Sequence, residues 1–175
     1  MKTKCIAVIP ARGGSKRVSR KNISLLNGKS LLWYSIDSAN KSNIFDSIYV
    51  NSEDDEILNK AIEFGVKSYK RPEQLATDEA SIIDVIKDMI VSLSLSDDDV
   101  LCILLPTAPL RKSIDIKNGY DLFKNNKMKS PVVSVTTYET PIQLAQYLDD
   151  NNHMCPIFEN DYKKSPHKKK YSNFS

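Results

Sequence analysis

The sequence predicts an α/β fold with a mostly parallel central sheet. Short apolar, β-branched runs alternate along the chain with stretches whose apolar residues recur at helical spacing, a pattern typical of βαβ units. The chain has 175 residues, of which 41% are hydrophobic, enough for one compact domain with a buried core. Both observations argue against a disordered chain.

Strands are predicted where apolar and β-branched residues run together between turn-forming residues. These runs are Cys5–Ile9, Ser47–Asn51, Val66–Tyr69, Val100–Leu105 and Val132–Val135. Since helical stretches separate them, neighbouring strands are expected to run parallel.

Helices are predicted over the stretches with helical periodicity. These begin at Leu31, Ile57, Ile83 and Ser113, the last running to Phe123. Ser30 stands where an N-cap belongs before the first helix, and either Ser52 or Glu53 does so before the second.

Beyond Thr140 the character of the sequence changes. Residues 141–158 contain two extended runs joined by the turn-rich segment Asp149–Asn152, so a β-hairpin is predicted rather than another βα unit. The residues after it are polar and show no period. The chain is therefore divided into an α/β core, residues 1–140, and a hairpin extension, residues 141–175.

Composition and charge restrict the possible partners and compartment. The formal net charge of +3 is too small to indicate a nucleic-acid-binding surface. No segment approaches the about 18 apolar residues that a membrane span requires. The cysteines, Cys5, Cys102 and Cys155, form no CxxC pair, which fits a reducing compartment. We expect a soluble, cytoplasmic protein without a nucleic-acid or membrane partner.

The basic loop, residues Arg12–Asn22, directly follows the first predicted strand and surrounds Gly13 and Gly14 with cations. In open α/β sheets ligands bind outside the carboxyl ends of the strands. Glycines let backbone N–H groups converge on anionic oxygens, and the cations neutralise their charge. A phosphate site is one interpretation, and a solvated basic turn is the other. Neither the dinucleotide-binding glycine pattern nor the Walker pattern is present.

Five blocks of the sequence carry a resemblance to a known family. They read IPARGGSKRVSRKN, NGKSLLWYSIDSA, YVNSEDDEI, RPEQLATDEAS and LLPTAPLR. In this order and spacing the chain, to about Thr140, resembles the acylneuraminate cytidylyltransferases, which make CMP-activated sialic acids and related nonulosonic acids. The resemblance implies a Rossmann-like nucleotidyltransferase fold. It also implies transfer of CMP from CTP to a small acidic sugar, with release of pyrophosphate.

The resemblance further implies roles for individual residues. Arg12 and Lys21 match the catalytic cations that bind the triphosphate. The implied nucleotide-binding residues are Ala11, Arg12, Gly13, Gly14, Ser15, Lys16, Lys21, Asn22, Arg71 and Ser81. Pro106 and Thr107 match the loop that borders the acceptor sugar, whereas Arg111 is expected to face water. Leu105 stands where many relatives carry glutamine, which leaves the identity of the acceptor open.

The resemblance implies Mg²⁺ as cofactor, but no metal ligand is assigned. Relatives hold this ion with an Asp-x-Asp further along their chains, and the present sequence is expected to be short at this end. The acidic run Glu53–Glu56 is interpreted as the start of a helix, and Asp97–Asp99 as a solvated turn.

Alternatives remain open for both activity and assembly. The chain could be a truncated CTP-binding module with little turnover, an octulosonate cytidylyltransferase or a guanylyltransferase. The apolar residues of the hairpin need a covering surface. Relatives pair two subunits through this region, so we expect a homodimer in which lysines between Lys163 and Lys170 lie near the neighbouring chain's pocket.

Overall fold

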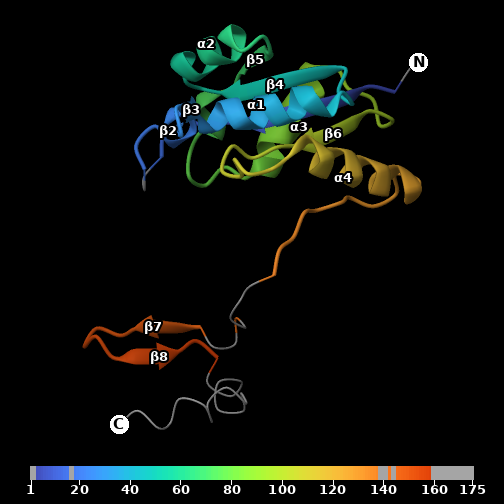
Figure 1. Cartoon of the computed structure of the whole chain (residues 1–175). Coiled ribbons are helices and arrows are strands. Elements are labelled where there is room, and N and C mark those ends of the chain that lie inside the picture. Colours follow the sequence, from blue (N-terminus) through green and yellow to red (C-terminus); the bar gives the residue numbers. More distant parts are fainter. Residues whose placement is uncertain (1–2, 16–17, 138–141, 143–144, 159–175) are drawn as a thin grey trace. The chain divides into compact units, whose positions relative to one another are not determined.

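The computed structural model describes residues 3–15, 18–137, 142 and 145–158. The chain forms two compact units, Met1–Val132 and Val133–Ser175. The first unit holds the predicted α/β core and the second holds the hairpin (Figure 1).

A four-stranded parallel sheet forms the centre of the first unit. Its strands are β1 (Cys5–Pro10), β4 (Ser47–Ser52), β5 (Lys67–Lys70) and β6 (Val100–Ile103). They lie in the order β5-β4-β1-β6, and every neighbouring pair is parallel. The predicted α/β fold with a parallel sheet is thereby confirmed.

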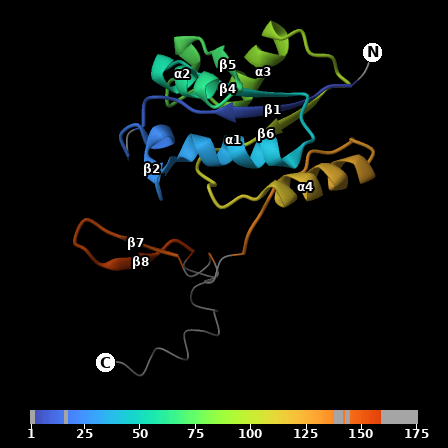
Figure 2. The ribbon, with the colours of Figure 1, turned by 45° about the horizontal axis from the view of Figure 1, so that its top comes forward.

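Four helices pack against this sheet. They are α1 (Leu31–Ser42), α2 (Asp55–Glu63), α3 (Ile82–Ser92) and α4 (Ser113–Asn125). Alternate residues of β1 point to opposite faces, because side chains alternate along a strand. Ala7 and Ile9 pack with α1, α2 and α4, whereas Ile6 and Val8 pack with α3. Figure 2 shows α1 and α4 side by side.

The strand order reverses between β1 and β6. The chain moves outward from β1 to β4 and β5, and then returns across the sheet to place β6 on the other side of β1. In doubly wound sheets such a reversal opens a crevice at the carboxyl ends of the two strands, where ligands bind.

Helix caps agree with the sequence prediction at one helix and differ at another. Ser30 caps α1, as predicted, because its side chain accepts a hydrogen bond from the Trp33 amide. The cap of α2 is Asp54, so the prediction of Ser52 or Glu53 was wrong. Ser52 is still part of β4, and its hydroxyl accepts a hydrogen bond from the Asp54 amide.

Short elements complete the first unit. They are the 3-10 helices η1 (Lys21–Ile23) and η2 (Glu73–Leu75) and the strands β2 (Leu25–Leu26) and β3 (Lys29–Ser30). The two strands pair antiparallel directly before α1. The basic loop therefore leads through η1 and a small hairpin into the first helix.

The strand predicted at Val132–Val135 does not form. Residues 131–137 have no regular secondary structure, and 75% of Val133 and 91% of Val135 are exposed. Within the described residues, β6 is an edge strand that pairs only with β1, and this β-branched run does not pair with its free edge. The prediction for β6 was also too long, because this strand ends at Ile103.

The second unit contains the predicted hairpin. Its strands β7 (Gln146–Leu148) and β8 (Met154–Pro156) pair antiparallel. The Asp149 carboxylate fixes the turn by accepting hydrogen bonds from the amides of Asn151 and His153. The basic stretch between Lys163 and Lys170 lies outside the described residues.

Two further observations concern the cysteines and the membrane-span prediction. Cys5, Cys102 and Cys155 are free thiols. Among the described residues, no helix has the length and apolar character needed to cross a membrane.

Candidate active site

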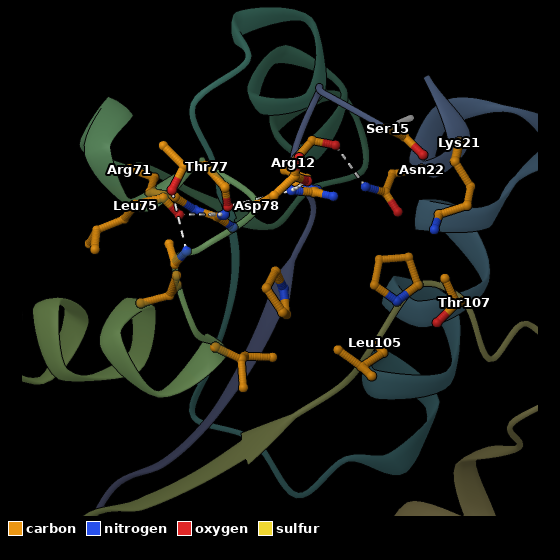
Figure 3. Close-up of a pocket in the computed structure, with 15 residues that line it drawn as sticks. Arg12, Ser15, Lys21, Asn22, Arg71, Leu75, Thr77, Asp78, Leu105 and Thr107 are labelled. Atoms are coloured by element: carbon orange, nitrogen blue, oxygen red, sulfur yellow. Dashed lines mark hydrogen bonds and ion pairs between the residues drawn. The ribbon is translucent and has the colours of Figure 1, made fainter. Parts of the chain in front are cut away.

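A pocket of about 350 Å³ opens at the carboxyl ends of the parallel strands. Its wall includes Pro10, the last residue of β1, and Leu105, Pro106 and Thr107, which follow β6. Cationic side chains reach it from two segments, with Arg12 and Lys21 in the basic loop and Arg71 after β5 (Figure 3). The crevice expected from the strand order is therefore a pocket lined by cations.

Arg12, the second residue after β1, extends into the pocket. Its Nη1 lies 2.7 Å from the Asp78 carboxylate, and its side chain is 36% exposed. An anionic ligand can reach this guanidinium, and it would compete with Asp78 for it.

Lys21 and Asn22 enter the pocket from η1 at the other end of the basic loop. The Asn22 side-chain amide is buried and donates a 2.8 Å hydrogen bond to the Arg12 carbonyl oxygen. This bond joins the beginning and the end of the loop. As a result, Ser15, Lys21 and Asn22 lie on one side of Arg12, and Arg71 lies on the other (Figure 3).

Arg71 forms a buried part of the pocket wall, with 5% of its surface exposed. Its Nε donates to the Asn51 side-chain oxygen at 2.5 Å, and its Nη2 donates to the Asn51 carbonyl oxygen at 2.9 Å. Burial lowers the pKa of Arg71, while the nearby carboxylate of Glu53 raises this pKa and the charge of Arg12 lowers it. Asn51 thus fixes the orientation of a cation that water barely reaches.

The loop after β6 is held by the backbone carbonyl group of its second residue, Leu105. The Leu105 carbonyl oxygen accepts hydrogen bonds from the Ser35 hydroxyl at 3.3 Å and from Arg111 Nη2 at 2.7 Å. The expectation that Arg111 faces water was wrong, because its guanidinium turns back onto this loop and its Nη1 is buried. This burial lowers the pKa of Arg111.

Other predicted nucleotide-binding residues do not line the pocket. Ala11 is buried, and its amide donates to the Asn51 carbonyl oxygen. The Gly13 amide, predicted as a phosphate donor, instead donates a 2.7 Å hydrogen bond to Glu53 Oε1. Ser81 caps α3 between two lining residues, Ala80 and Ile82. Neither it nor Gly14 is among the lining residues, and Lys16 lies outside the described residues.

Three polar residues near the pocket had no predicted role in ligand binding. They are Asn51, Glu53 and Asp78. Asp78 lies in the RPEQLATDEAS block, so the sequence could have indicated that this residue is near the site. Asn51 was read only as the end of a strand, and Glu53 only as the start of a helix.

No protein-held metal site is apparent in the part of the chain that the structure describes. Within these residues, no group of three or more His, Cys, Asp or Glu side chains is close enough to hold an ion. The residues that the structure describes therefore do not by themselves form a site that would hold a metal ion.

The fold and the pocket define a nucleotidyltransferase-like α/β protein with a cationic pocket at the strand reversal. Residues 6–170 match the family described as Cytidylyltransferase. The chain therefore belongs to the cytidylyltransferase family.

Curated relatives agree with this assignment. The chain is 41% identical over 166 residues to the pseudaminic acid cytidylyltransferase of Campylobacter jejuni subsp. jejuni serotype O:2, covering 93% of this chain and 70% of that protein. It is 38% identical over 165 residues to the N-acylneuraminate cytidylyltransferase of Escherichia coli O18:K1:H7, covering 94% of this chain and 38% of that protein. The chain thus spans only part of the length of these relatives.

A solved structure supports the fold. CMP:2-keto-3-deoxy-manno-octonic acid synthetase complexed with CTP superimposes with a TM-score of 0.62 at 20% identity, over 71% of this chain and 49% of that chain. The Rossmann-like nucleotidyltransferase fold is confirmed.

Proposed function

We propose that this chain is a cytidylyltransferase, or the nucleotide-binding part of one. It transfers CMP from CTP to a nonulosonic acid of the sialic, legionaminic or pseudaminic acid type and releases pyrophosphate. The observation that carries this proposal is the convergence of Arg12, Lys21 and Arg71 on one pocket at the strand reversal. The names of the curated relatives support the choice of CTP and of this acceptor class.

The reaction is a nucleotidyl transfer. The anomeric hydroxyl oxygen of the sugar forms a bond to the α-phosphorus, and the bond from this phosphorus to the departing pyrophosphate breaks. The protein must align the attacking oxygen and offset negative charge that gathers on the phosphates. Arg12 can fork two hydrogen bonds to phosphate oxygens, and Lys21 adds a mobile point charge as the pyrophosphate leaves.

The remaining pocket residues are assigned to the base and the acceptor. Arg71, held by Asn51, would contact the nucleotide from one side of Arg12, and Asn22 and Ser15 would contact it from the other side. Pro106 and Thr107 would border the acceptor sugar. Proline restricts the shape of that loop, and the threonine hydroxyl can donate or accept a hydrogen bond.

Mg²⁺ is an expected companion of the bound triphosphate. This ion keeps several waters and is commonly held through substrate phosphates, so it does not require a cage of side chains. Because the described residues offer no cluster for it, no step of the reaction is assigned to a residue through the metal.

The activity is tested by measuring pyrophosphate release with Mg²⁺, each of the four ribonucleoside triphosphates and each candidate acceptor. We expect release with CTP and a nine-carbon α-keto sugar acid. Release only with the eight-carbon octulosonate, or only with GTP, would support the octulosonate cytidylyltransferase or the guanylyltransferase instead.

A second candidate is a CTP-binding module with little turnover. The lack of a metal-holding cluster among the described residues favours it. Thermal-shift measurements with the four nucleotides separate the candidates. Stabilisation by CTP without pyrophosphate release would identify the module, and equal stabilisation by all four nucleotides would contradict base-specific binding.

We further propose a cytoplasmic homodimer that pairs through the hairpin of the second unit. Apolar side chains of this hairpin are exposed in the isolated chain, with Leu148 63% and Met154 67% exposed. A two-stranded hairpin is marginal in water without a covering surface. Sedimentation of the intact chain against a chain ending at Thr140 tests this. Two monomers at micromolar concentration would contradict the proposal.

A further inference from the structure

The acidic turn, Glu53–Glu56, joins β4 to α2 and contacts the basic loop. Acidic residues at a helix N-terminus are already explained by the helix dipole, and Asp54 does cap α2. However, Glu53, Asp54 and Glu56 also bind residues of the basic loop, far earlier in the chain. Capping alone does not require these contacts.

The first contact joins Glu53 to Gly13. Glu53 Oε1 accepts a 2.7 Å hydrogen bond from the Gly13 amide. The other carboxylate oxygen, Oε2, is buried and accepts no hydrogen bond from any residue that the structure describes. Leaving one carboxylate oxygen buried without a hydrogen-bond donor costs stability.

The second contact is the packing of Gly13 against Asp54. A Cβ atom at position 13 would lie 2.8 Å from the Asp54 Cβ and 2.9 Å from its Cγ. Real Cβ atoms do not approach so closely, so only glycine allows the loop backbone to rest on the acidic turn. This fit is independent of the hydrogen bond to Glu53.

The third contact holds the far end of the basic loop. Arg20 Nη2 lies 2.6 Å from Glu56 Oε2 and 3.3 Å from Asp54 Oδ2. Arg20 has a φ of 50°, in the left-handed region that non-glycine residues adopt infrequently. Its side-chain contacts help to hold this backbone conformation directly before Lys21.

The two anchored residues are the immediate neighbours of the two pocket cations in the basic loop. Gly13 follows Arg12, and Arg20 precedes Lys21. We propose that Glu53, Asp54 and Glu56 of the acidic turn act as positioning residues that present Arg12 and Lys21 to the triphosphate, with Glu53 as the main one. This inference rests on the proposed function of the pocket as a nucleotide site.

Positioning and simple electrostatics predict opposite effects of removing these carboxylates. A negative charge near an anion site repels the ligand, so its removal alone should strengthen CTP binding. If the acidic turn orders the loop, its removal weakens CTP binding instead. The sign of the change in Kd therefore discriminates between the two roles.

The experiment measures the Kd of CTP by calorimetry for the intact chain and its variants. We expect Glu53→Ala to weaken binding about tenfold, as for the loss of one charge-assisted hydrogen bond. Glu53→Gln should recover part of the loss, because its amide oxygen can still accept the Gly13 hydrogen bond. Glu56→Gln, on an exposed carboxylate, should weaken binding about twofold.

Asp55→Ala is the matched control. It removes the same charge from the same turn, but Asp55 is 82% exposed and pairs with Lys70 rather than with the basic loop. We expect CTP binding within about twofold of the unchanged chain, or slightly tighter. Unchanged or tighter binding in both Glu53→Ala and Glu56→Gln would overturn the proposal.

Hydrogen exchange keeps the test independent of CTP binding. In the nucleotide-free chain, the Gly13 amide should exchange faster in Glu53→Ala than in Asp55→Ala. If the unchanged chain binds no CTP, the proposed function fails, and exchange alone then tests whether the turn orders the loop. Equal exchange rates of the Gly13 amide in Glu53→Ala and Asp55→Ala would contradict the proposal that the acidic turn orders the basic loop. If Glu53→Ala does not fold, the test uses Glu56→Gln instead and measures hydrogen exchange of the backbone amides around Arg20.

Discussion

The loops after β1 and β6 border the same pocket but are held by different interactions. The basic loop after β1 is held by carboxylates, with Glu53 on the Gly13 amide and Glu56 on Arg20. The loop after β6 is held through one neutral group, the Leu105 carbonyl oxygen.

This difference matches what each loop presents to the pocket. The basic loop presents cations, which repel one another, and nearby carboxylates reduce that repulsion while they fix the backbone. The loop after β6 presents Leu105, Pro106 and Thr107, which carry no charge and require only a fixed shape. Ionic strength should therefore affect the first loop more than the second.

The largest expected effect comes from removing a cation of the basic loop. Arg12→Ala and Lys21→Ala should each lower the rate of pyrophosphate release about a hundredfold, because each removes charge stabilisation at the phosphates. Neither should unfold the chain, since both side chains line an open pocket. Pyrophosphate release and circular dichroism measure the two effects.

Lys29→Ala provides the control for these variants. Lys29 lies in β3 outside the pocket lining, 5.2 Å from the Trp33 ring centre, and its loss should leave the rate nearly unchanged. Full activity of Arg12→Ala or Lys21→Ala would mean that the loop is only a solvated basic turn. If the unchanged chain shows no turnover, CTP affinity replaces the rate.

A smaller effect is expected from Asn51→Ala, which removes the side-chain acceptor of Arg71 from β4, on the other side of β1 from β6. The variant should lose about 2 kcal/mol of unfolding free energy, because Arg71 Nε is left buried without its acceptor. Urea denaturation measures this loss. Asn40→Ala, on the exposed surface of α1, is the control. If Asn51→Ala and Asn40→Ala lose the same unfolding free energy, Asn51 does not anchor Arg71.

Arg111→Met tests the neutral loop alone. We expect a loss of about 1 kcal/mol of unfolding free energy, since the hydrogen bond to Leu105 is lost while the buried Nη1 is relieved. The KM of the acceptor should rise while the KM of CTP stays unchanged. Lys112→Met, an exposed neighbouring cation, is the control. An equal rise in both KM values would show that the two loops are not independent.

The smallest effect is expected at the amino ends of the same two strands. Hydrogen bonds from the backbone amides of Ser96 and Lys4 lower the pKa of Asp99 below its ordinary 3.8. The ionised carboxylate therefore adds stability above pH 3.8, and this stability is lost as the pH falls through the lowered pKa.

The corresponding variant is Asp99→Asn. It should unfold at a lower temperature than the unchanged chain at pH 7, and the difference should shrink below pH 3.8. Melting curves across this range measure it. A difference that stays constant with pH would contradict the contribution of the ionised form.

Much of the sheet could be predicted from local pattern. The runs that became β1 and β4 are apolar, β-branched and followed by amphipathic stretches, so each could be read without its neighbours. The run Val132–Val135 has the same local pattern but forms no strand, because a strand also requires actual pairing with a neighbouring strand and this run does not pair with the free edge of β6. Local patterns do not contain that information.

The pocket was predictable in part, for a similar reason. The cations Arg12 and Lys21 stand out by composition and by their place after β1. The role of Glu53 was hidden, because an acidic residue before a helix already has a local explanation. Its contact with Gly13 joins residues 40 positions apart, a distance over which a single sequence gives no signal.

The close packing of Gly13 on Asp54 has an evolutionary consequence. A side chain at position 13 would need position 54 to lose its own, yet a glycine there would give up the side-chain oxygen that caps α2. A larger residue at position 13 is thus opposed by the Asp54 side chain, and loss of the Asp54 side chain is opposed by the cap of α2. A side chain should therefore be accepted at position 13 in evolution only together with a smaller residue at position 54.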